Sequence, residues 1–255
     1  MTAQLDLRAR AARQAMVIEA EQLSPAERAM AIETWRGRMV NEYVSSRVFA
    51  ALVPQLIAAE IDPVIVGDVA AMVVEEIEHG TRCAAVVIAL GGEAVAELPP
   101  LVEVPTHGDV EPLEAALRNV LSIACLSETV AVALLTAERD RTEPAPLRAT
   151  LTAILSDEVG HARFGWRLLE LLAPRLTPAL RARLSRYLAP AFQTLRRYEL
   201  DNLPIGATPS PAAQAVGVCD GRAARAVFFH TVEAVIVPGL EAHGLAAAAA
   251  WRQAA

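Results

Sequence analysis

The sequence predicts an all-helical protein built around a four-helix bundle. Hydrophobic residues make up 54% of the 255 residues, enough for a sizeable core, whereas aromatic residues make up only 4%. The core must therefore consist largely of Ala, Leu and Val, a composition that favours helix packed on helix over a sheet. Proline and glycine also divide the chain into segments of helical length.

The first half of the chain predicts two long helices. Ser24-Pro25-Ala26-Glu27 is a capping box with proline at the first helical position, so a helix begins there. It is expected to run, with or without a break, to about Ile61, where Asp62-Pro63 stops it. The second helix is expected over residues 64–90, ended by two glycines. Residues 97–110 hold three prolines and one glycine and form a connection long enough to cross the bundle.

The second half predicts two more bundle helices and a C-terminal extension. Helices are expected over residues 111–141 and 147–172, joined by a short turn. Two additional helices follow, over residues 177–200 and 222–252, the last one kinked at Pro238. We therefore expect one domain, 1–255, with a core bundle at about 25–173 and an extension at about 177–252. Helices paired by short turns, with one long crossover between the second and third, describe a four-helix bundle of known type.

Charge, cysteines and hydropathy exclude several classes of function. The net charge is −7 and no basic stripe is present, which disfavours nucleic-acid binding. Three scattered cysteines form neither a disulfide framework nor a zinc ribbon. The N-terminal residues lack a secretory signal, and charged residues interrupt the most apolar stretches, so no membrane span is expected. These observations predict a cytoplasmic protein.

Two copies of one short pattern carry the chemistry. Glu76 and His79, like Glu158 and His161, form a Glu-x-x-His motif inside a predicted helix. Residues three apart share a helix face, so each pair can direct one carboxylate and one imidazole to one point. Chance would give about 0.4 such patterns in a chain of this composition.

A single glutamate precedes each motif on the helix before it. Glu42 lies 34 residues before Glu76, and Glu128 lies 30 residues before Glu158. Both single glutamates are surrounded by apolar residues, and a buried carboxylate costs several kcal/mol unless it is paired or binds metal. Two divalent ions would neutralise four carboxylates. The alternative is a bundle whose buried Glu and His side chains only hydrogen-bond one another.

With every ligand position filled, residues 24–172 resemble the ferritin-like di-iron carboxylate superfamily, in its oxygenase and oxidase branch. The segment around Ser156-Asp157-Glu158 is especially similar to that superfamily's fourth helix. The resemblance implies that Glu42, Glu76 and His79 hold one metal ion, and that the other is held by Glu128, Glu158 and His161. One or two glutamates should bridge the ions. Two iron ions are expected, with manganese as the alternative.

Four further residues are weaker candidates. Metal-bound histidines usually donate their second N–H to a carboxylate. By the symmetry of the repeat, Asp157 would orient His79 and Glu75 would orient His161, although both acids are also compatible with a solvated surface. In the last helix, His230 and Glu233 share a face and are candidates for an extra ligand, against the alternative of an ordinary polar pair.

The resemblance implies an enzyme that activates dioxygen to oxidise a small molecule. Hydroxylation and N-oxygenation are the first reactions to consider, and oxidative cleavage of a fatty aldehyde is another. The substrate would lie in a pocket lined by the bundle helices and covered by the last two. Expected partners are dioxygen, the substrate and an external electron donor, with no nucleic acid and no membrane; a homodimer is common in the superfamily. The alternatives are an iron-oxidising or peroxide-scavenging protein related to ferritin or rubrerythrin, and a non-catalytic helical scaffold.

Overall fold

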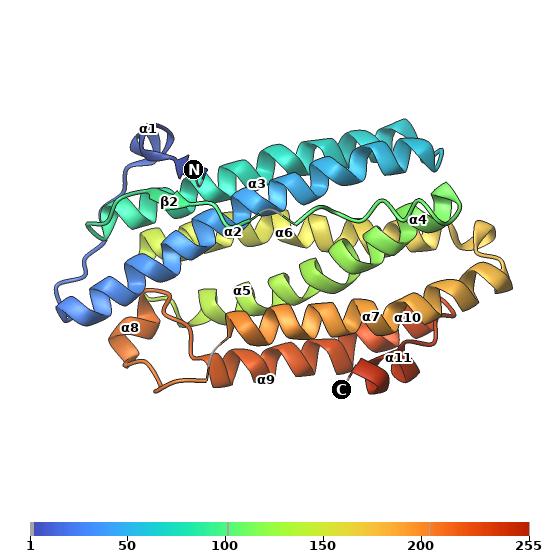
Figure 1. Cartoon of the computed structure of the whole chain (residues 1–255). Helices are drawn as coiled ribbons and strands as arrows, with labels where there is room; N and C mark the ends of the chain where they lie inside the picture. Colours follow the sequence, from blue (N-terminus) through green and yellow to red (C-terminus); the bar gives the residue numbers. More distant parts are fainter. Residues whose placement is uncertain (1–2, 101, 204, 255) are drawn as a thin grey trace.

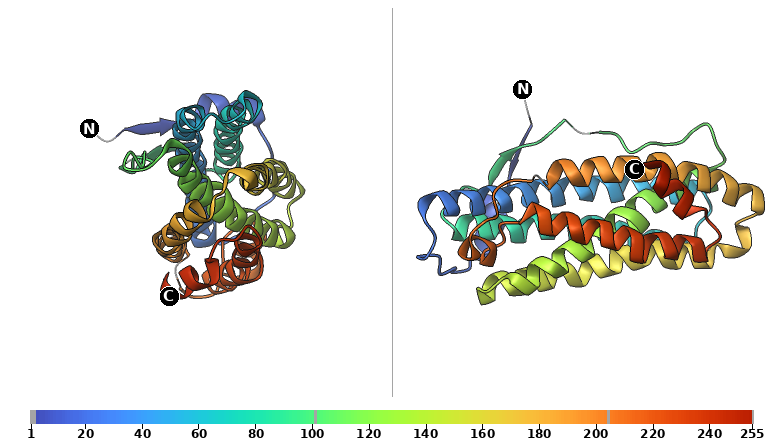
Figure 2. Two further views of the ribbon diagram at one scale, coloured as in Figure 1. Left: turned by 90° about the vertical axis from the view of Figure 1, so that its right-hand side faces the viewer. Right: turned by 90° about the horizontal axis from the view of Figure 1, so that it is seen from below.

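The computed structural model describes residues 3–100, 102–203 and 205–254, and its architecture is the predicted all-α bundle (Figure 1). Seen end-on, the bundle helices surround a common centre (Figure 2). Its first two helices are α2 (Pro25–Ala58) and α3 (Pro63–Ala89). The capping box of α2 is present: the Ser24 hydroxyl accepts from the Glu27 N–H, and the Glu27 carboxylate accepts from the Ser24 N–H. Pro54 lies inside α2 without ending it.

The third bundle helix differs from the regular α-helix that the sequence predicts. It consists of α4 (Pro112–Val120), a π-helical segment η2 (Leu121–Glu128) and α5 (Thr129–Arg141) in one continuous run. In a π-helix, backbone hydrogen bonds join residues five apart, which widens the helix and inserts a residue into the turn. The fourth helix is α6 (Ala145–Leu171). The π-helical segment ends at Glu128, one of the predicted ligands.

A short strand pair, which the sequence analysis did not predict, ties the N-terminus to the crossover. Strand β1 (Gln4–Asp6) pairs antiparallel with β2 (Val95–Glu97), with Leu5 opposite Ala96. Leu5 is buried, which favours this register. After β1 come one short α-helix, α1 (Arg8–Ala11), and one 3₁₀ turn, η1 (Ala12–Gln14). The crossover then runs along the bundle to α4 (Figure 1).

The C-terminal extension packs on the third helix and contains more breaks than predicted. A 3₁₀ turn, η3 (Ala173–Arg175), leads to α7 (Pro178–Asn202), and α8 (Pro211–Ala215) follows. The predicted last helix over 222–252 is wrong in its second half. The chain forms α9 (Gly221–Thr231), a π-helical turn η4 (Val232–Ile236) and α10 (Val237–Ala242), and then reverses before α11 (Ala247–Ala254). Gly244 has a φ of 75°, which ends the helix.

Two helical runs are long and apolar enough to cross a membrane by length and composition alone, where the sequence analysis expected none. They are Pro112–Arg141 and Gly221–Ala242, whose most apolar windows are 50% and 33% buried inside the molecule. Core helices of soluble proteins pass the same test. The first run brings Glu128 into the bundle centre, as a core helix does.

Candidate metal centre

The predicted ligands occupy a polar layer between two apolar clusters along the bundle. Towards one end, Trp35 of α2, Cys83 of α3 and Leu151 of α6 belong to one cluster. Towards the other end, Phe49 of α2 and Phe164 of α6 belong to the second cluster. Each helix thus passes from apolar to polar and back to apolar side chains. Water is therefore excluded from both ends of the layer.

All six predicted ligands meet in this layer, in two overlapping groups. Within each group, one potential ligand atom from every member lies within 4.8 Å of the others. The first group is Glu42, Glu76, His79 and Glu158, and the second is Glu76, Glu128, Glu158 and His161. Glu76 and Glu158 belong to both groups, so each can bridge two ions.

Distances to the two histidines show how the groups interlock. His79 Nδ1 lies 3.3 Å from Glu158 Oε1 and 3.8 Å from Glu42 Oε2. His161 Nδ1 lies 3.1 Å from Glu76 Oε1 and 3.3 Å from Glu158 Oε2. His79 Nδ1 also lies 4.0 Å from Glu76 Oε2. Each imidazole therefore directs its Nδ1 towards carboxylates of both α3 and α6, the helices that carry the two Glu-x-x-His motifs.

The opposite nitrogen of each ring binds the carboxylate anticipated from the repeat. His79 Nε2 donates to Asp157 Oδ2 at 3.1 Å, and His161 Nε2 donates to Glu75 Oε2 at 2.9 Å. The bonds cross between helices, since Asp157 lies on α6 and Glu75 on α3. With Nε2 protonated, Nδ1 of each neutral ring keeps a lone pair directed at the cluster.

Burial makes the cluster unstable without a positive partner. Glu76 is 1% exposed and Glu158 3%, and each has one oxygen without a hydrogen-bond partner among the described residues. His79 Nδ1 and His161 Nδ1 are also buried and unpartnered. Unpaired atoms of this kind are costly, and here all four belong to one cluster of carboxylates and imidazoles. The residues thus fit a pair of divalent cations.

Without metal, the buried negative charge of the carboxylates is offset by protons, as the raised pKa values of the cluster show. Burial alone would lower the pKa of His79, but the carboxylates of Glu158 and Glu42 outweigh it and raise that pKa to about 11. Burial raises the pKa of Glu76 to about 8, and the nearby His161 imidazole opposes that rise. Burial, reinforced by Glu158, also raises the pKa of Glu128 well above its ordinary value. The cluster therefore binds protons that divalent ions could replace.

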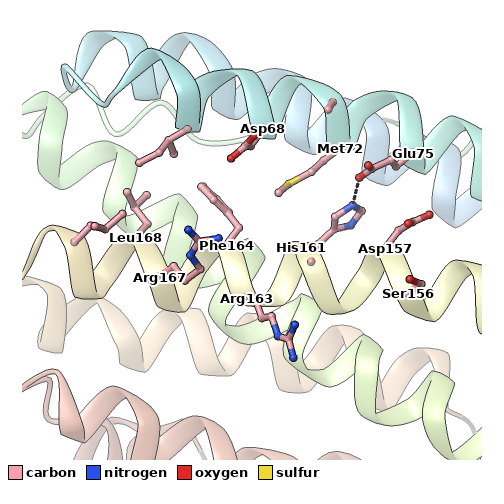
Figure 3. Close-up of a pocket in the computed structure, with 14 residues that line it drawn as sticks. Asp68, Met72, Glu75, Ser156, Asp157, His161, Arg163, Phe164, Arg167 and Leu168 are labelled. Carbon is pink, nitrogen blue, oxygen red and sulfur yellow. Dashed lines mark hydrogen bonds and ion pairs between the residues drawn. The ribbon is translucent and has the colours of Figure 1, made fainter.

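A glycine follows His79 on α3 and another precedes His161 on α6, and the two have different surroundings. A Cβ on Gly80 would lie 3.2 Å from the Met39 carbonyl oxygen, so α2 and α3 approach closely there. A Cβ on Gly160 would meet nothing within 4 Å. Gly160 instead lines a groove of about 440 Å³ between α3 and α6 (Figure 3).

This groove is not the pocket that the sequence analysis expected. Its lining residues come from α3 and α6 alone, with none from the C-terminal helices. Met72, Phe164 and Leu168 supply apolar walls, and the groove reaches the edge of His161 that bonds Glu75 (Figure 3). A molecule in the groove would therefore meet the outer side of that imidazole.

His230 and Glu233 do not join the cluster. Both are exposed, and neither belongs to the two groups of potential ligands found among the described residues. His107 is half-buried, with its ring edge on Tyr187.

Phe49 contacts the site but was not among the residues predicted from the sequence. The Phe49 ring packs edge-on against His161, with 5.1 Å between ring centroids. Phe49 lies seven residues after Glu42 on α2, a spacing that places both on one helix face and could have identified it.

Comparisons with known proteins establish the fold. No protein-family model matches the chain, and no curated protein does. Among solved structures, a protein with aldehyde deformylating oxidase activity from Synechococcus is similar, with a TM-score of 0.61 and 18% identity. The match covers 90% of this chain and 96% of that one. The chain therefore has a ferritin-like, all-α fold.

Proposed function

We propose that the protein is a non-haem di-iron oxidoreductase that uses dioxygen to oxidise a small molecule. One observation carries the proposal: two groups of ligand atoms share Glu76 and Glu158, and their buried inner atoms lack other partners. Four carboxylates and two imidazoles suit two iron or manganese ions. The ferritin-like fold, in which such sites occur between facing helices, favours iron.

The protein's own residues would position the ions and control protons. Bound ferrous ions would supply the electrons for dioxygen chemistry. Asp157 and Glu75 would hold the imidazoles in orientation and keep Nε2 protonated. Phe49 and the flanking apolar clusters exclude water, which strengthens the electrostatic interactions inside the layer.

The activity of the similar Synechococcus protein suggests which substrates to test first. Because the Synechococcus protein has aldehyde deformylating oxidase activity, we propose medium- and long-chain aldehydes as the first substrates to test, followed by hydroxylation and N-oxygenation substrates. An external electron donor and a cytoplasmic location are part of the same proposal. A homodimer is the assembly to look for.

Metal content per chain after anaerobic loading with ferrous iron tests the proposal. We expect about two iron ions per chain. Glu158→Ala should lose at least one ion while the chain stays helical, since Glu158 belongs to both ligand groups. Glu78→Ala is the matched control, because Glu78 lies on α3 near Glu76 but outside both groups. Unchanged metal content in Glu158→Ala would refute the ligand assignment.

The same preparation separates the alternative functions. Addition of dioxygen and an aldehyde should give product in proportion to the bound iron. An uptake far above two ions per chain would instead indicate iron oxidation and storage. Folded protein with no bound metal would indicate a helical scaffold with a buried polar network.

A further inference from the structure

The π-helical segment Leu121–Glu128 determines where Glu128 points. A π turn holds one more residue than an α turn, and one residue of an α-helix corresponds to a rotation of about 100°. If η2 relaxed to an α-helix, residues after it would rotate by about that angle relative to α4. Glu128, the last residue of η2, would then turn away from α3 and α6. The orientation of this predicted ligand thus depends on whatever maintains the π turn.

On one side, α6 accommodates the widened backbone. A Cβ at Gly165 would lie 2.7 Å from Ala124 Cβ and 2.9 Å from Cys125 Sγ, so only glycine fits at this approach. The Trp166 indole N–H donates to Thr129 Oγ1 at 3.1 Å, directly after the π-helical segment. These contacts position the segment against α6 without themselves selecting its hydrogen-bond register.

On the other side, Tyr187 of α7 reaches the first turn of η2. The hydroxyl groups of Tyr187 and Ser122 lie 2.8 Å apart. The Ser122 carbonyl accepts a bond from the hydroxyl of Ser127, five residues further on, at 3.1 Å. Ser127 directly precedes Glu128, so the chain of contacts runs from Tyr187 to the residue before the ligand.

The Tyr187 ring is itself held in place from two directions. The Arg118 guanidinium lies 5.3 Å from the ring centroid, and the His107 ring meets it edge-on at 5.4 Å. His107 belongs to the crossover, so α4 and the crossover together fix the tyrosine. A side chain restrained in this way can determine the position of its hydrogen-bond partner.

We propose that Tyr187 is a positioning residue of the metal centre, which through Ser122 maintains the π turn that directs Glu128 at the cluster. The inference rests on the proposed di-iron site and adds to it a residue from the C-terminal extension. The expected consequence is selective: the ion held by Glu128 and His161 should depend on Tyr187. The ion held by Glu42 and His79 should not.

Anaerobic titration with ferrous iron, followed by elemental analysis, tests the inference in three variants. In Tyr187→Phe and in Ser122→Ala, one of the two ions should bind about tenfold more weakly and the other should be unchanged. The double variant should lose no more affinity than either single variant, because both changes remove one interaction. Hydrogen exchange of the metal-free chains should be faster at amides 121–129 in all three variants.

Thr136→Ala is the control, since that hydroxyl bonds the Val132 carbonyl four residues back, in the regular part of the same helix. It should change neither ion's affinity. Parent-like affinities and exchange in Tyr187→Phe and Ser122→Ala would overturn the inference, and so would an equal loss at both ions. If the parent chain binds no metal, the proposed function fails. Unchanged exchange at amides 121–129 would then separately show that Tyr187 does not hold the turn.

Discussion

Replacing Asp157 by Ala should weaken binding of the proposed ion at His79, a residue on the opposite helix, and leave binding of the proposed ion at His161 unchanged. Asp157 Oδ2 accepts from His79 Nε2 at 3.1 Å, although Asp157 is the sequence neighbour of Glu158. A carboxylate that orients a metal-bound imidazole typically contributes 10- to 100-fold in metal affinity. The Asp157 side chain is 42% exposed, so water can partly replace it, and we expect a loss of about tenfold, or about 1.4 kcal/mol.

Two single-site backgrounds make the assay specific. The chain with His161→Ala should keep the proposed ion at His79, and the chain with His79→Ala should keep the proposed ion at His161. Asp157→Ala should lower ferrous iron affinity about tenfold in the first background only, as measured by anaerobic equilibrium dialysis. Glu75→Ala should do the reverse, since Glu75 Oε2 accepts from His161 Nε2 at 2.9 Å with the same 42% exposure. An effect of Asp157→Ala that is equal in both backgrounds would refute the crossed arrangement.

Three predictions concern stability, measured by urea unfolding of the metal-free chain. Gly165→Ala should lower the free energy of unfolding by about 2 kcal/mol, because the added Cβ overpacks the contact with η2. Gly160→Ala should raise it by about 0.5 kcal/mol, because a Cβ there meets nothing within 4 Å. A loss of stability in both variants would contradict the packing argument. Burial raises the pKa of Glu199 from 4.5 to about 7, so its carboxyl lowers stability as the pH rises through that range. Glu199→Gln should therefore gain up to about 3 kcal/mol at pH 8 and little at pH 4, and a gain independent of pH would exclude this cause. Arg38→Met leaves the half-buried Glu138 carboxylate without its ion-pair partner and should lower the free energy of unfolding by about 2 kcal/mol. The double variant Arg38→Met/Glu138→Leu should recover most of that loss.

The grouping of the six candidate ligands could be anticipated because it depends on local geometry. Glu76 and His79 share a helix face whatever the rest of the chain does, and so do Glu158 and His161. The alternation of single glutamates and motifs then places one or two of the six candidate ligands on each of four helices. Their role as metal ligands stays a prediction.

The π-helical segment could not be anticipated, because the residues that accommodate it are distant in sequence. Gly165 and Tyr187 lie about 40 and 60 residues beyond the segment, and neither has a local pattern that indicates its contact. The one local signal is the five-residue spacing of Ser122 and Ser127, which is too common to predict a π turn by itself. By contrast, the break at Gly244, which the predicted helix over residues 222–252 missed, has a local signal, since a glycine directly after His243 is an ordinary end of a helix.

The two shared glutamates also constrain when the site can form during synthesis. Glu76 belongs to the first helical hairpin, which together with strands β1 and β2 is complete once Glu97 has left the ribosome. Glu158 and His161 emerge only some sixty residues later, so the nascent hairpin carries three of the six ligands and no complete group. In the proposed di-iron protein, metal acquisition would therefore follow translation of α6. Until then, the carboxylates of the early hairpin would face water and stay charged.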